Sequence, residues 1–376
     1  MKNLEQIPSP CFVIEEGKLI SNLKLIDSVQ RSAGVKIILA FKGFAMWSMF
    51  PLVRQYLSGA TASSLHEALL CSEYMKSKAH TYCVAYDNDT FDQVAELSSH
   101  LTFNSLHQFE RFKSKTPKGV SIGLRVNPEW SDVATDLYNP ASPTSRLGVT
   151  RENMPDELPQ EIEGLHFHVL CESSAESLAE LLRRFEQSFG NYLPSIKWLN
   201  LGGGHLMTRT GYDQELLINT LNDFREKHQI EIILEPGSAI AWETGFLRAK
   251  VLDVVESGGE QTAIADISFT CHMPDCLEMP YKPRITGAKS DPTHSAFSYR
   301  IGGVSCLAGD FMSAYGFDTA IQVGDQLIFE DMVHYTMVKT STFNGVQHPS
   351  IGVIRTSGDF ELIRAFGYND FKQRLS

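Results

Sequence analysis

The sequence predicts an α/β fold in which a (β/α)8, TIM-like barrel is followed by a mainly β domain. Between residue 35 and about residue 240, short apolar runs alternate with longer amphipathic stretches, which is the pattern of successive βα units. After Gly245 the runs are alternating or β-branched and are separated by Gly, Pro and Asp. Because 376 residues exceed one ordinary core, we place a barrel at residues 12–244 and a β-rich domain at residues 245–376, together with residues 1–11.

Eight apolar runs of strand length lie in the first part of the chain, and eight strands close a barrel of this kind. They are Val35–Phe41, Gly59–Ser63, Thr81–Ala85, Leu101–Asn104, Ser121–Val126, Ile162–His168, Trp198–Leu201 and Glu231–Leu234. Most of these runs end at polar or glycine residues, namely Lys42, Ser63 and Ser64, Asn104, Arg125 with Asn127, His168, Gly202–Gly204 and Glu235. Since barrels of this type carry their active sites at the carboxyl ends of the strands, we expect the functional site there.

The segment Ser173–Phe189 predicts one of the helices that surround the barrel. Leu178, Leu181, Leu182 and Phe185 follow polar capping candidates at the spacing i, i+3, i+4, i+7, which places them on one helix face.

The β-rich domain has its own predicted strands, and one long loop precedes it in the barrel. The strands are Leu247–Val255, Thr262–Ile267, Ala296–Ile301, Gln326–Phe329 and Gly352–Ile354. Asn127–Arg146 has no clear periodicity and is long for a βα loop, so we expect it to lie over the barrel mouth.

Composition limits the partners and the compartment. The formal net charge of −12 argues against nucleic acid and mildly favours cationic ligands. The seven cysteines are odd in number and include no C-x-x-C pair, which fits neither a disulfide scaffold nor a structural zinc module. The N-terminus lacks an apolar signal core, and no run of about 18 apolar residues occurs. We therefore expect a cytoplasmic protein without a membrane span.

Lys42 closes the apolar run Val35–Phe41 and is followed at once by Gly43. A half-buried amine at a strand end loses solvation, which lowers its pKa and makes it a nucleophile toward an aldehyde cofactor such as pyridoxal phosphate. From this segment alone, a lysine that merely extends to solvent is the favoured alternative.

Glycines and a carboxylate follow the last two predicted strands. Gly202, Gly203 and Gly204 can close backbone N–H groups around a phosphate, and the loops after strands seven and eight often form the phosphate site of a barrel. Glu235 precedes a Pro-Gly turn and could keep the pyridine nitrogen of pyridoxal phosphate protonated. A tight turn and an ordinary turn glutamate are the alternatives.

His166 and His168 alternate along strand six, so their imidazoles face one side and Phe167 faces the other. One imidazole could stack on a cofactor ring. A metal site is the alternative, with His205, Asp266 and His272 as further ligands, but no metal-ligand spacing unites these residues.

The β-rich domain adds a thiol, a carboxylate and a phenol. Cys306 and Asp310 follow Gly302 and Gly303; a thiol can protonate a carbanion, and a carboxylate can pair with a substrate ammonium. Tyr335 could donate to a phosphate. A small buried thiol and a buried tyrosine are the alternatives.

In this order, the motifs resemble the alanine racemase-like, or fold type III, pyridoxal-phosphate decarboxylases, which include ornithine, diaminopimelate and biosynthetic arginine decarboxylases. The resemblance covers essentially the whole chain and rests on Lys42, Ala62-Ser63-Ser64 with Glu67, Phe103-Asn104-Ser105, Ser145-Arg146-Leu147-Gly148, His168-Val169, Gly202-Gly203-Gly204, Glu235-Pro236-Gly237, Cys306 and Tyr335. The segments Thr270–Asp275, Leu277–Tyr281 and Ser305–Asp310 are similar to the branch of the family that acts on carboxynorspermidine and carboxyspermidine.

The resemblance implies roles for individual residues. Lys42 would bind the cofactor covalently, His168 would stack on its ring and Glu235 would pair with the ring nitrogen. The three glycines and Tyr335 would hold the phosphate, and Cys306 would protonate the product from the partner subunit of a homodimer. The acidic candidates for substrate binding are Asp275, Glu278 and Asp310, with His272 beside them. Ser238 replaces an arginine common in relatives, and His205 replaces an aromatic residue found in ornithine decarboxylases.

The expected activity is therefore pyridoxal-phosphate-dependent decarboxylation of carboxynorspermidine or carboxyspermidine to norspermidine or spermidine in polyamine biosynthesis, with no metal. A decarboxylase or racemase of a basic amino acid is the alternative within the fold. A metal-dependent barrel hydrolase using His166, His168 and His205 is the alternative from another class, and a non-catalytic cofactor binder is the third.

Overall fold

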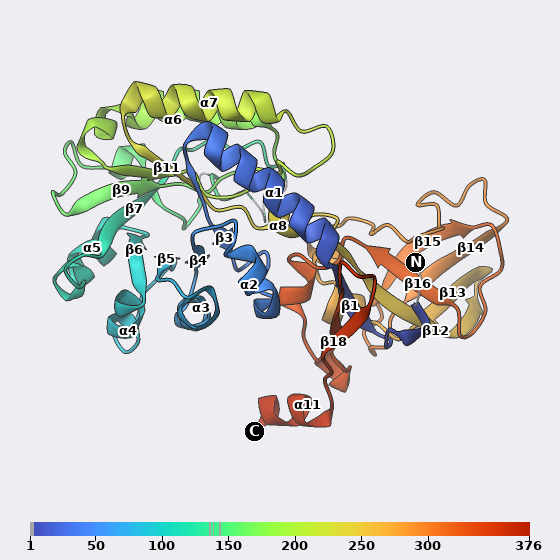
Figure 1. The fold of residues 1–376 in the computed structure, drawn as a ribbon. Helices are drawn as coiled ribbons and strands as arrows, with labels where there is room; N and C mark the ends of the chain where they lie inside the picture. The colour runs from blue at the N-terminus through green and yellow to red at the C-terminus, as the bar shows by residue number, and fades with distance from the viewer. Residues whose placement is uncertain (1–3, 135–136, 138, 143) are drawn as a thin grey trace. The chain divides into compact units, whose positions relative to one another are not determined.

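The computed structural model describes residues 4–134, 137, 139–142 and 144–376, which divide into two compact units (Figure 1). One unit comprises residues 22–240, and the other comprises residues 1–21 and 241–376. Four residues of the predicted loop Asn127–Arg146 lie outside the described ranges. No helix of the described residues is long and apolar enough to cross a bilayer.

The unit of residues 22–240 is a barrel of parallel strands. The strands are β2 (Lys36–Ile37), β3 (Leu39–Ala40), β4 (Ala60–Ala62), β5 (Ala79–Tyr82), β6 (Ser98–Phe103), β7 (Ser121–Asn127), β8 (Val149–Thr150), β9 (Ile162–His166), β10 (Trp198–Asn200) and β11 (Glu231–Leu234). Their order is β2-β11-β10-β9-β7-β6-β5-β4-β3, with β8 beside β7.

One interrupted strand closes the ring. The Ile38 N–H, between β2 and β3, donates to the Leu234 carbonyl at 2.9 Å, and the Leu39 N–H donates to the Gly59 carbonyl at 3.0 Å. The same segment therefore pairs with β11 on one side and with β4 on the other. A strand is present at each of the eight predicted positions, although β5 and β6 begin earlier than expected, and the predicted fold class is confirmed.

A tryptophan fills part of the barrel core. Trp198 is paired in register with Gly164 of β9, and a Cβ atom there would lie 2.1 Å from the indole ring. A Cβ atom at Gly123 of β7 would lie 2.3 Å from the same ring. Only glycine leaves room for this side chain, which packs with Ile38 and Ile233.

Helices follow most barrel strands. They are α1 (Glu16–Ala33), which spans the boundary between the two units, α2 (Phe50–Val53), α3 (Leu65–Leu70), α4 (Phe91–Glu96), α5 (Leu106–Phe112), α6 (Ala175–Phe189), α7 (Gln214–His228) and α8 (Ser238–Ala241). The prediction for α6 is confirmed: Ser174 caps its N-terminus by accepting from the Ser177 N–H. Leu178, Leu181 and Phe185 are buried on one face.

The second unit contains a mixed sheet ordered β15-β14-β13-β12-β1-β17-β18, with β16 paired to β12. Its strands are β1 (Cys11–Glu15), β12 (Gly245–Ser257), β13 (Glu260–Ala265), β14 (Phe297–Gly302), β15 (Phe311–Phe317), β16 (Gln326–Glu330), β17 (Ser350–Ile354) and β18 (Phe360–Arg364). Its helices are α9 (Phe269–His272), α10 (Asp275–Glu278) and α11 (Tyr368–Leu375).

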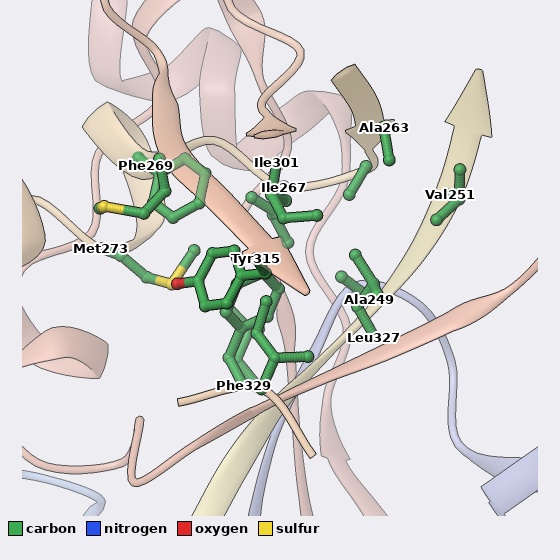
Figure 2. Packing of buried hydrophobic residues seen from close by; sticks show 14 of the residues in the cluster. Ala249, Val251, Ala263, Ile267, Phe269, Met273, Ile301, Tyr315, Leu327 and Phe329 are labelled. Atoms are coloured by element: carbon green, nitrogen blue, oxygen red, sulfur yellow. The ribbon is translucent and has the colours of Figure 1, made fainter. Parts of the chain in front are cut away.

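The first strand of the chain belongs to this sheet. β1 pairs with β12 in antiparallel and with β17 in parallel orientation, so the boundary falls after β1 and not at residue 12 as predicted. A core of buried side chains covers the sheet, including Phe269, Ile301, Tyr315 and Phe329 (Figure 2). The Tyr315 hydroxyl satisfies its hydrogen bond by donating to the Pro283 carbonyl at 2.7 Å.

Candidate active site

Lys42 lies in a tight turn directly after β3, at the carboxyl end of the barrel. The Gly43 N–H closes the turn by donating to the Ala40 carbonyl at 3.0 Å. A Cβ atom on Gly43 would lie 2.5 Å from the Cα atom of Gly237, so this position requires glycine. The close approach brings Lys42 beside the segment that follows β11 and carries Glu235.

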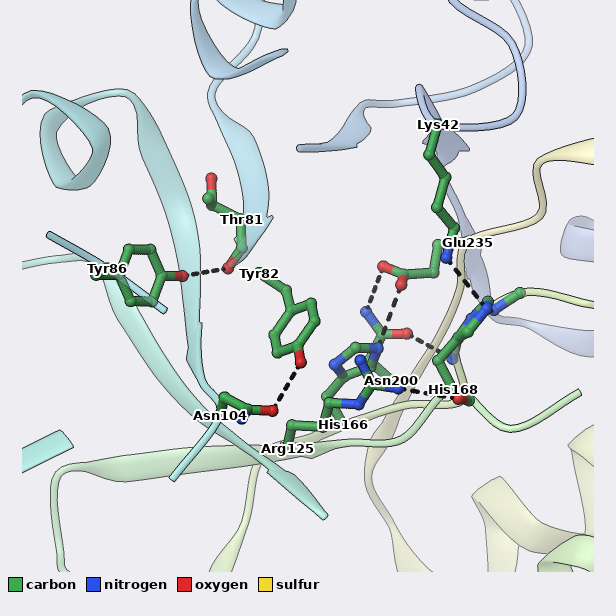
Figure 3. A network of polar contacts seen from close by, with 12 residues as sticks. Lys42, Thr81, Tyr82, Tyr86, Asn104, Arg125, His166, His168, Asn200 and Glu235 are labelled. Carbon is green, nitrogen blue, oxygen red and sulfur yellow. Dashed lines mark hydrogen bonds and ion pairs between the residues drawn. The ribbon is translucent and has the colours of Figure 1, made fainter. Parts of the chain in front are cut away.

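His168 contacts Lys42, and its hydrogen bonds determine which nitrogen carries the proton (Figure 3). The Gly203 N–H donates to Nδ1 of His168 at 2.7 Å, so Nδ1 is an acceptor. A neutral imidazole with an accepting Nδ1 carries its hydrogen on Nε2. Nε2 lies 3.1 Å from Nζ of Lys42, which can accept this hydrogen only as an uncharged amine.

The surroundings of Lys42 favour this uncharged form. Part of the side chain is exposed, yet desolvation by the surrounding protein lowers the pKa of the amine, and the Arg125 charge lowers it further. Glu235 acts in the opposite direction without reversing the shift. Lys42 is therefore poised as a nucleophile.

Glu235 is a buried carboxylate with two partners. Nδ2 of Asn200 donates to Oε2 at 3.0 Å, and Nε2 of His166 lies 3.2 Å from Oε1. Desolvation alone would raise the pKa of Glu235, but the neighbouring His166 holds it below its ordinary value. Glu235 is therefore ionised and can hold a proton on a neighbouring ring nitrogen.

Arg125 supplies a fixed positive charge beneath this group. Its Nη2 donates to the His168 carbonyl at 3.0 Å, and its guanidinium lies 4.6 Å from the centre of the Tyr82 ring. The Tyr82 hydroxyl in turn donates to Oδ1 of Asn104 at 2.7 Å. Asn104 thus links the strand ends to one another.

The three glycines are required where their loop crosses the ends of β9 and β11. Gly202 and Gly204 have φ angles of 70° and 90°. A Cβ atom on Gly203 would lie 2.6 Å from the Glu235 carbonyl oxygen, and one on Gly204 would lie 2.2 Å from the Leu170 carbonyl oxygen. This packing explains why glycine is needed at these three positions. Phosphate binding by the loop stays a prediction.

Asp310 is the most deeply buried of the predicted substrate-binding carboxylates in the second unit. Its Oδ1 accepts from the Phe269 and Thr270 N–H groups at 2.7 and 3.2 Å, and its Oδ2 accepts from Ser305 at 3.1 Å. His272 is also buried, and its Nδ1 accepts from the Ser268 N–H at 3.2 Å. Both side chains therefore have structural roles within this unit, and substrate contact by either stays a prediction.

Asp275 and Glu278 share a cation of their own unit. Nζ of Lys339 lies 2.5 Å from Oδ1 of Asp275 and also contacts Oε2 of Glu278. The two carboxylates therefore share the ammonium group of Lys339, and their predicted contact with a cationic substrate stays a prediction.

Cys306 is exposed, and Tyr335 has an unusual backbone conformation. Cys306 is an exposed free thiol whose backbone N–H donates to Oδ1 of Asn344 at 2.8 Å. Tyr335 has a φ of 45° at the start of a short helix, Thr336–Lys339, which is uncommon for a residue other than glycine. Their predicted roles in proton donation and phosphate binding stay predictions.

Asn200 was not predicted from the sequence. Its signal is a lone amide inside the apolar run Trp198–Leu201, at a position where a parallel strand is buried on both faces. The prediction for strand six is confirmed, because His166 and His168 contact Glu235 and Lys42 while Phe167 packs 4.8 Å from Phe185 of α6.

The side chains of the barrel site suit pyridoxal phosphate. An uncharged amine matches its aldehyde, and an ionised carboxylate matches a protonated ring nitrogen. Among the described residues, no group of three or more His, Cys, Asp and Glu side chains is arranged to hold a metal ion.

Comparisons with known proteins place the chain in context. The family model described as "Pyridoxal-dependent decarboxylase, C-terminal sheet domain" matches residues 12–333. A carboxyaminopropylagmatine decarboxylase of Synechocystis is 51% identical over 99% of this chain and 96% of its own. A carboxynorspermidine/carboxyspermidine decarboxylase of Campylobacter jejuni is 42% identical over 98% and 99%. The crystal structure of carboxynorspermidine decarboxylase from Campylobacter jejuni, complexed with norspermidine, has a TM-score of 0.92 and 41% identity, covering 98% of this chain and all of that one.

Proposed function

Because the chain belongs to the pyridoxal-dependent decarboxylase family, we propose that it removes carbon dioxide from a polyamine precursor that carries a carboxyaminopropyl group. The observation that carries the proposal is the group formed by Lys42, His168 and Glu235 at the barrel mouth, in a chain similar over its whole length to decarboxylases of such compounds. The family assignment favours this activity over a metal-dependent hydrolase.

Our preferred substrate is carboxyaminopropylagmatine, because the relative with the higher identity is named for it. Carboxynorspermidine and carboxyspermidine, the substrates expected from the sequence, are the second candidates, supported by the relatives named for them. All three candidate substrates carry the same carboxyaminopropyl group, which loses the carbon dioxide. They differ at the far end, where the first carries a guanidinium group and the others carry an ammonium group, so the choice depends on residues remote from the reacting carbon.

Several residues would hold the cofactor. When bound, pyridoxal phosphate supplies an aldehyde that condenses with amines and a ring that accepts the electrons released on decarboxylation. The uncharged Lys42 would bind it covalently, His168 would lie against the ring, and Glu235 would hold the proton on the ring nitrogen. Gly202, Gly203, Gly204 and Tyr335 would contact the phosphate.

The substrate carbon must gain a proton when it loses its carboxylate. The bond between this carbon and the carboxylate breaks, carbon dioxide leaves, and Cys306 of the partner subunit donates the thiol proton that takes its place. Water then restores the thiol, so each turnover consumes one proton. This role makes the proposed enzyme a homodimer with shared active sites. Asp275, Glu278, Asp310 and His272 remain the candidates near the distal end of the substrate.

A substrate panel tests the proposal. Purified protein supplied with pyridoxal phosphate is given carboxyaminopropylagmatine, carboxynorspermidine, carboxyspermidine, ornithine and diaminopimelate, and carbon dioxide and amine products are measured. We expect the highest kcat/KM with carboxyaminopropylagmatine and lower values with the two carboxylated triamines. A higher kcat/KM with either amino acid would reject the substrate class. Racemised substrate without carbon dioxide, or turnover lost to a chelator without a visible cofactor band, would reject the reaction.

A further inference from the structure

The interior of the barrel beside Glu235 is polar, although branched apolar side chains dominate most barrel cores of this type. His80 of β5, His100 of β6 and His166 of β9 line a cavity of about 10 Å³ together with Glu235 and Asn200. A volume of this size is about the least that holds one water molecule. Three histidines on three strands thus share a single small space with the carboxylate.

These histidines are uncharged. Burial lowers the pKa of His80 to about 3, and the nearby His100 lowers it further. Burial also lowers the pKa of His100 and of His166. The rings of His80 and His100 lie 3.9 Å apart and nearly parallel, which two imidazolium cations would oppose. Each neutral ring offers one donor and one acceptor.

His166 connects this space to Glu235. Its Nε2 lies 3.2 Å from Oε1 of Glu235 without the alignment of a full hydrogen bond, and its Nδ1, which is also fully buried, has no hydrogen-bond partner among the described residues. Because His166 lines the cavity, Nδ1 can be satisfied by a water molecule there. The other oxygen of Glu235 is held by the amide of Asn200.

We propose that His166 is a positioning residue, which together with Asn200 orients the Glu235 carboxylate through neutral groups. A buried water that links His166 to His80 and His100 holds the His166 ring in place. The inference rests on the proposed function, because it concerns the carboxylate that would face the cofactor ring. A neutral donor fixes the oxygen atoms of a carboxylate without cancelling its charge. An arginine in the same place would compete for the charge that a protonated ring nitrogen needs.

The charged and titratable groups near Glu235 come from several elements, and none of the other imidazoles adds a positive charge. They are Lys42 after β3, His80 on β5, Arg125 on β7, His166 on β9, His168 after β9, and His205 after β10. Burial also lowers the pKa of His168, and that of His205 to about 4. Arg125 is held at the His168 carbonyl, so the full charge of Glu235 is available to the ring nitrogen.

The test compares His166→Leu, which removes the donor, with His166→Gln, which restores a neutral donor. The dissociation constant of pyridoxal phosphate is measured on each apoprotein by fluorescence titration, and the visible band of the loaded protein is followed with pH. We expect His166→Leu to weaken binding about tenfold or more and to move the titration of the band, because the polar contact that orients the Glu235 carboxylate is lost. His166→Gln should recover most of the wild-type cofactor affinity and most of the wild-type titration of the visible band.

His228→Gln is the matched control, since His228 contacts the carboxylate of Glu186 at 2.7 Å on the outer helices. It should leave both measurements unchanged. Wild-type affinity and titration in a folded His166→Leu protein would overturn the proposal. If that variant does not fold, His80→Leu tests the water link, with an expected loss of about threefold in affinity, and an unchanged value would overturn it.

Covalent trapping separates this inference from the proposed function. Borohydride reduction of the loaded protein, followed by mass spectrometry, should add the cofactor to Lys42 in the wild type and in every His166 variant. Failure to trap it in the wild type would reject the proposed function, whereas trapping with equal affinities in all variants would reject only the role of His166.

Discussion

In the barrel unit, the predicted functional residues contact one another or a neighbouring strand, as Lys42 contacts His168 and Glu235 contacts His166. In the other unit, the predicted functional residues contact structural segments of that unit. Nζ of Lys42 lies 3.1 Å from Nε2 of His168, and the Gly203 N–H holds the other ring nitrogen of His168. Asp310 instead accepts from three backbone N–H groups of its own unit.

This difference separates two tasks. A cofactor needs groups held on rigid elements, and the barrel supplies them at the ends of its strands. Selection of a cationic substrate depends on carboxylates that can pair with it. In this structure, Asp275 and Glu278 pair with Lys339, so a substrate ammonium would have to compete with that side chain. Changes in the barrel should therefore alter the chemistry, and changes in the sheet unit should alter stability and KM.

The largest expected effect is that of Lys42→Ala. Loss of the nucleophile should lower kcat on the order of 10⁴-fold or more and abolish the borohydride-trapped adduct. Lys36→Ala is the matched control, because Lys36 lies on the same interrupted strand but is exposed and paired with Glu231. Its kcat should match that of the wild type. An adduct retained in Lys42→Ala would assign the cofactor to another lysine.

Cys306→Ala should have the next largest effect. Without its proton donor, the enzyme should lose about 10²- to 10³-fold in kcat, while the cofactor spectrum stays that of the wild type. Leu307→Ala, which changes the exposed neighbouring residue, should have little effect on kcat. Product analysis in deuterated water checks the step, since a variant that incorporates deuterium at the wild-type rate does not need the thiol.

The features predicted from the sequence are those that depend on short segments. The apolar runs identified the barrel strands because a strand buried on both faces is mostly apolar, and the residues after them pointed to Lys42, His168 and Glu235. The helix α6 was found because its apolar face repeats every three to four residues.

The features that were missed depend on contacts between distant segments. β1 was assigned to the barrel because its apolar sequence does not say that its partners are β12 and β17. The backbone contact of Asp310 was missed because sequence spacing does not show that its carboxylate accepts from Phe269, while its predicted contact with the substrate stays a prediction. Asn200 was missed because its partner, Glu235, follows the neighbouring strand β11 and is distant in the sequence.

Asp310→Ala should reveal a structural role more than a catalytic one. Removing the carboxylate leaves three backbone N–H groups without acceptors, which should lower the free energy of unfolding by about 3 kcal/mol. Asp318→Ala is the control, because its exposed carboxylate pairs only on the surface with Lys289. Chemical denaturation measures both. Unchanged stability with a large rise in KM would make Asp310 a substrate ligand after all.

The smallest expected effect is that of Lys339→Met, and it tests whether the sheet unit selects the substrate by charge. Removing the ammonium leaves Asp275 and Glu278 with excess negative charge, so the KM for a cationic substrate should fall about threefold while kcat stays constant. The difference should shrink in high salt, because exposed charges are screened. Lys289→Met, which breaks the surface pair with Asp318, should leave KM unchanged. If Lys339→Met changes stability alone, the two carboxylates serve the fold, and the residues that choose between a guanidinium and an ammonium lie elsewhere.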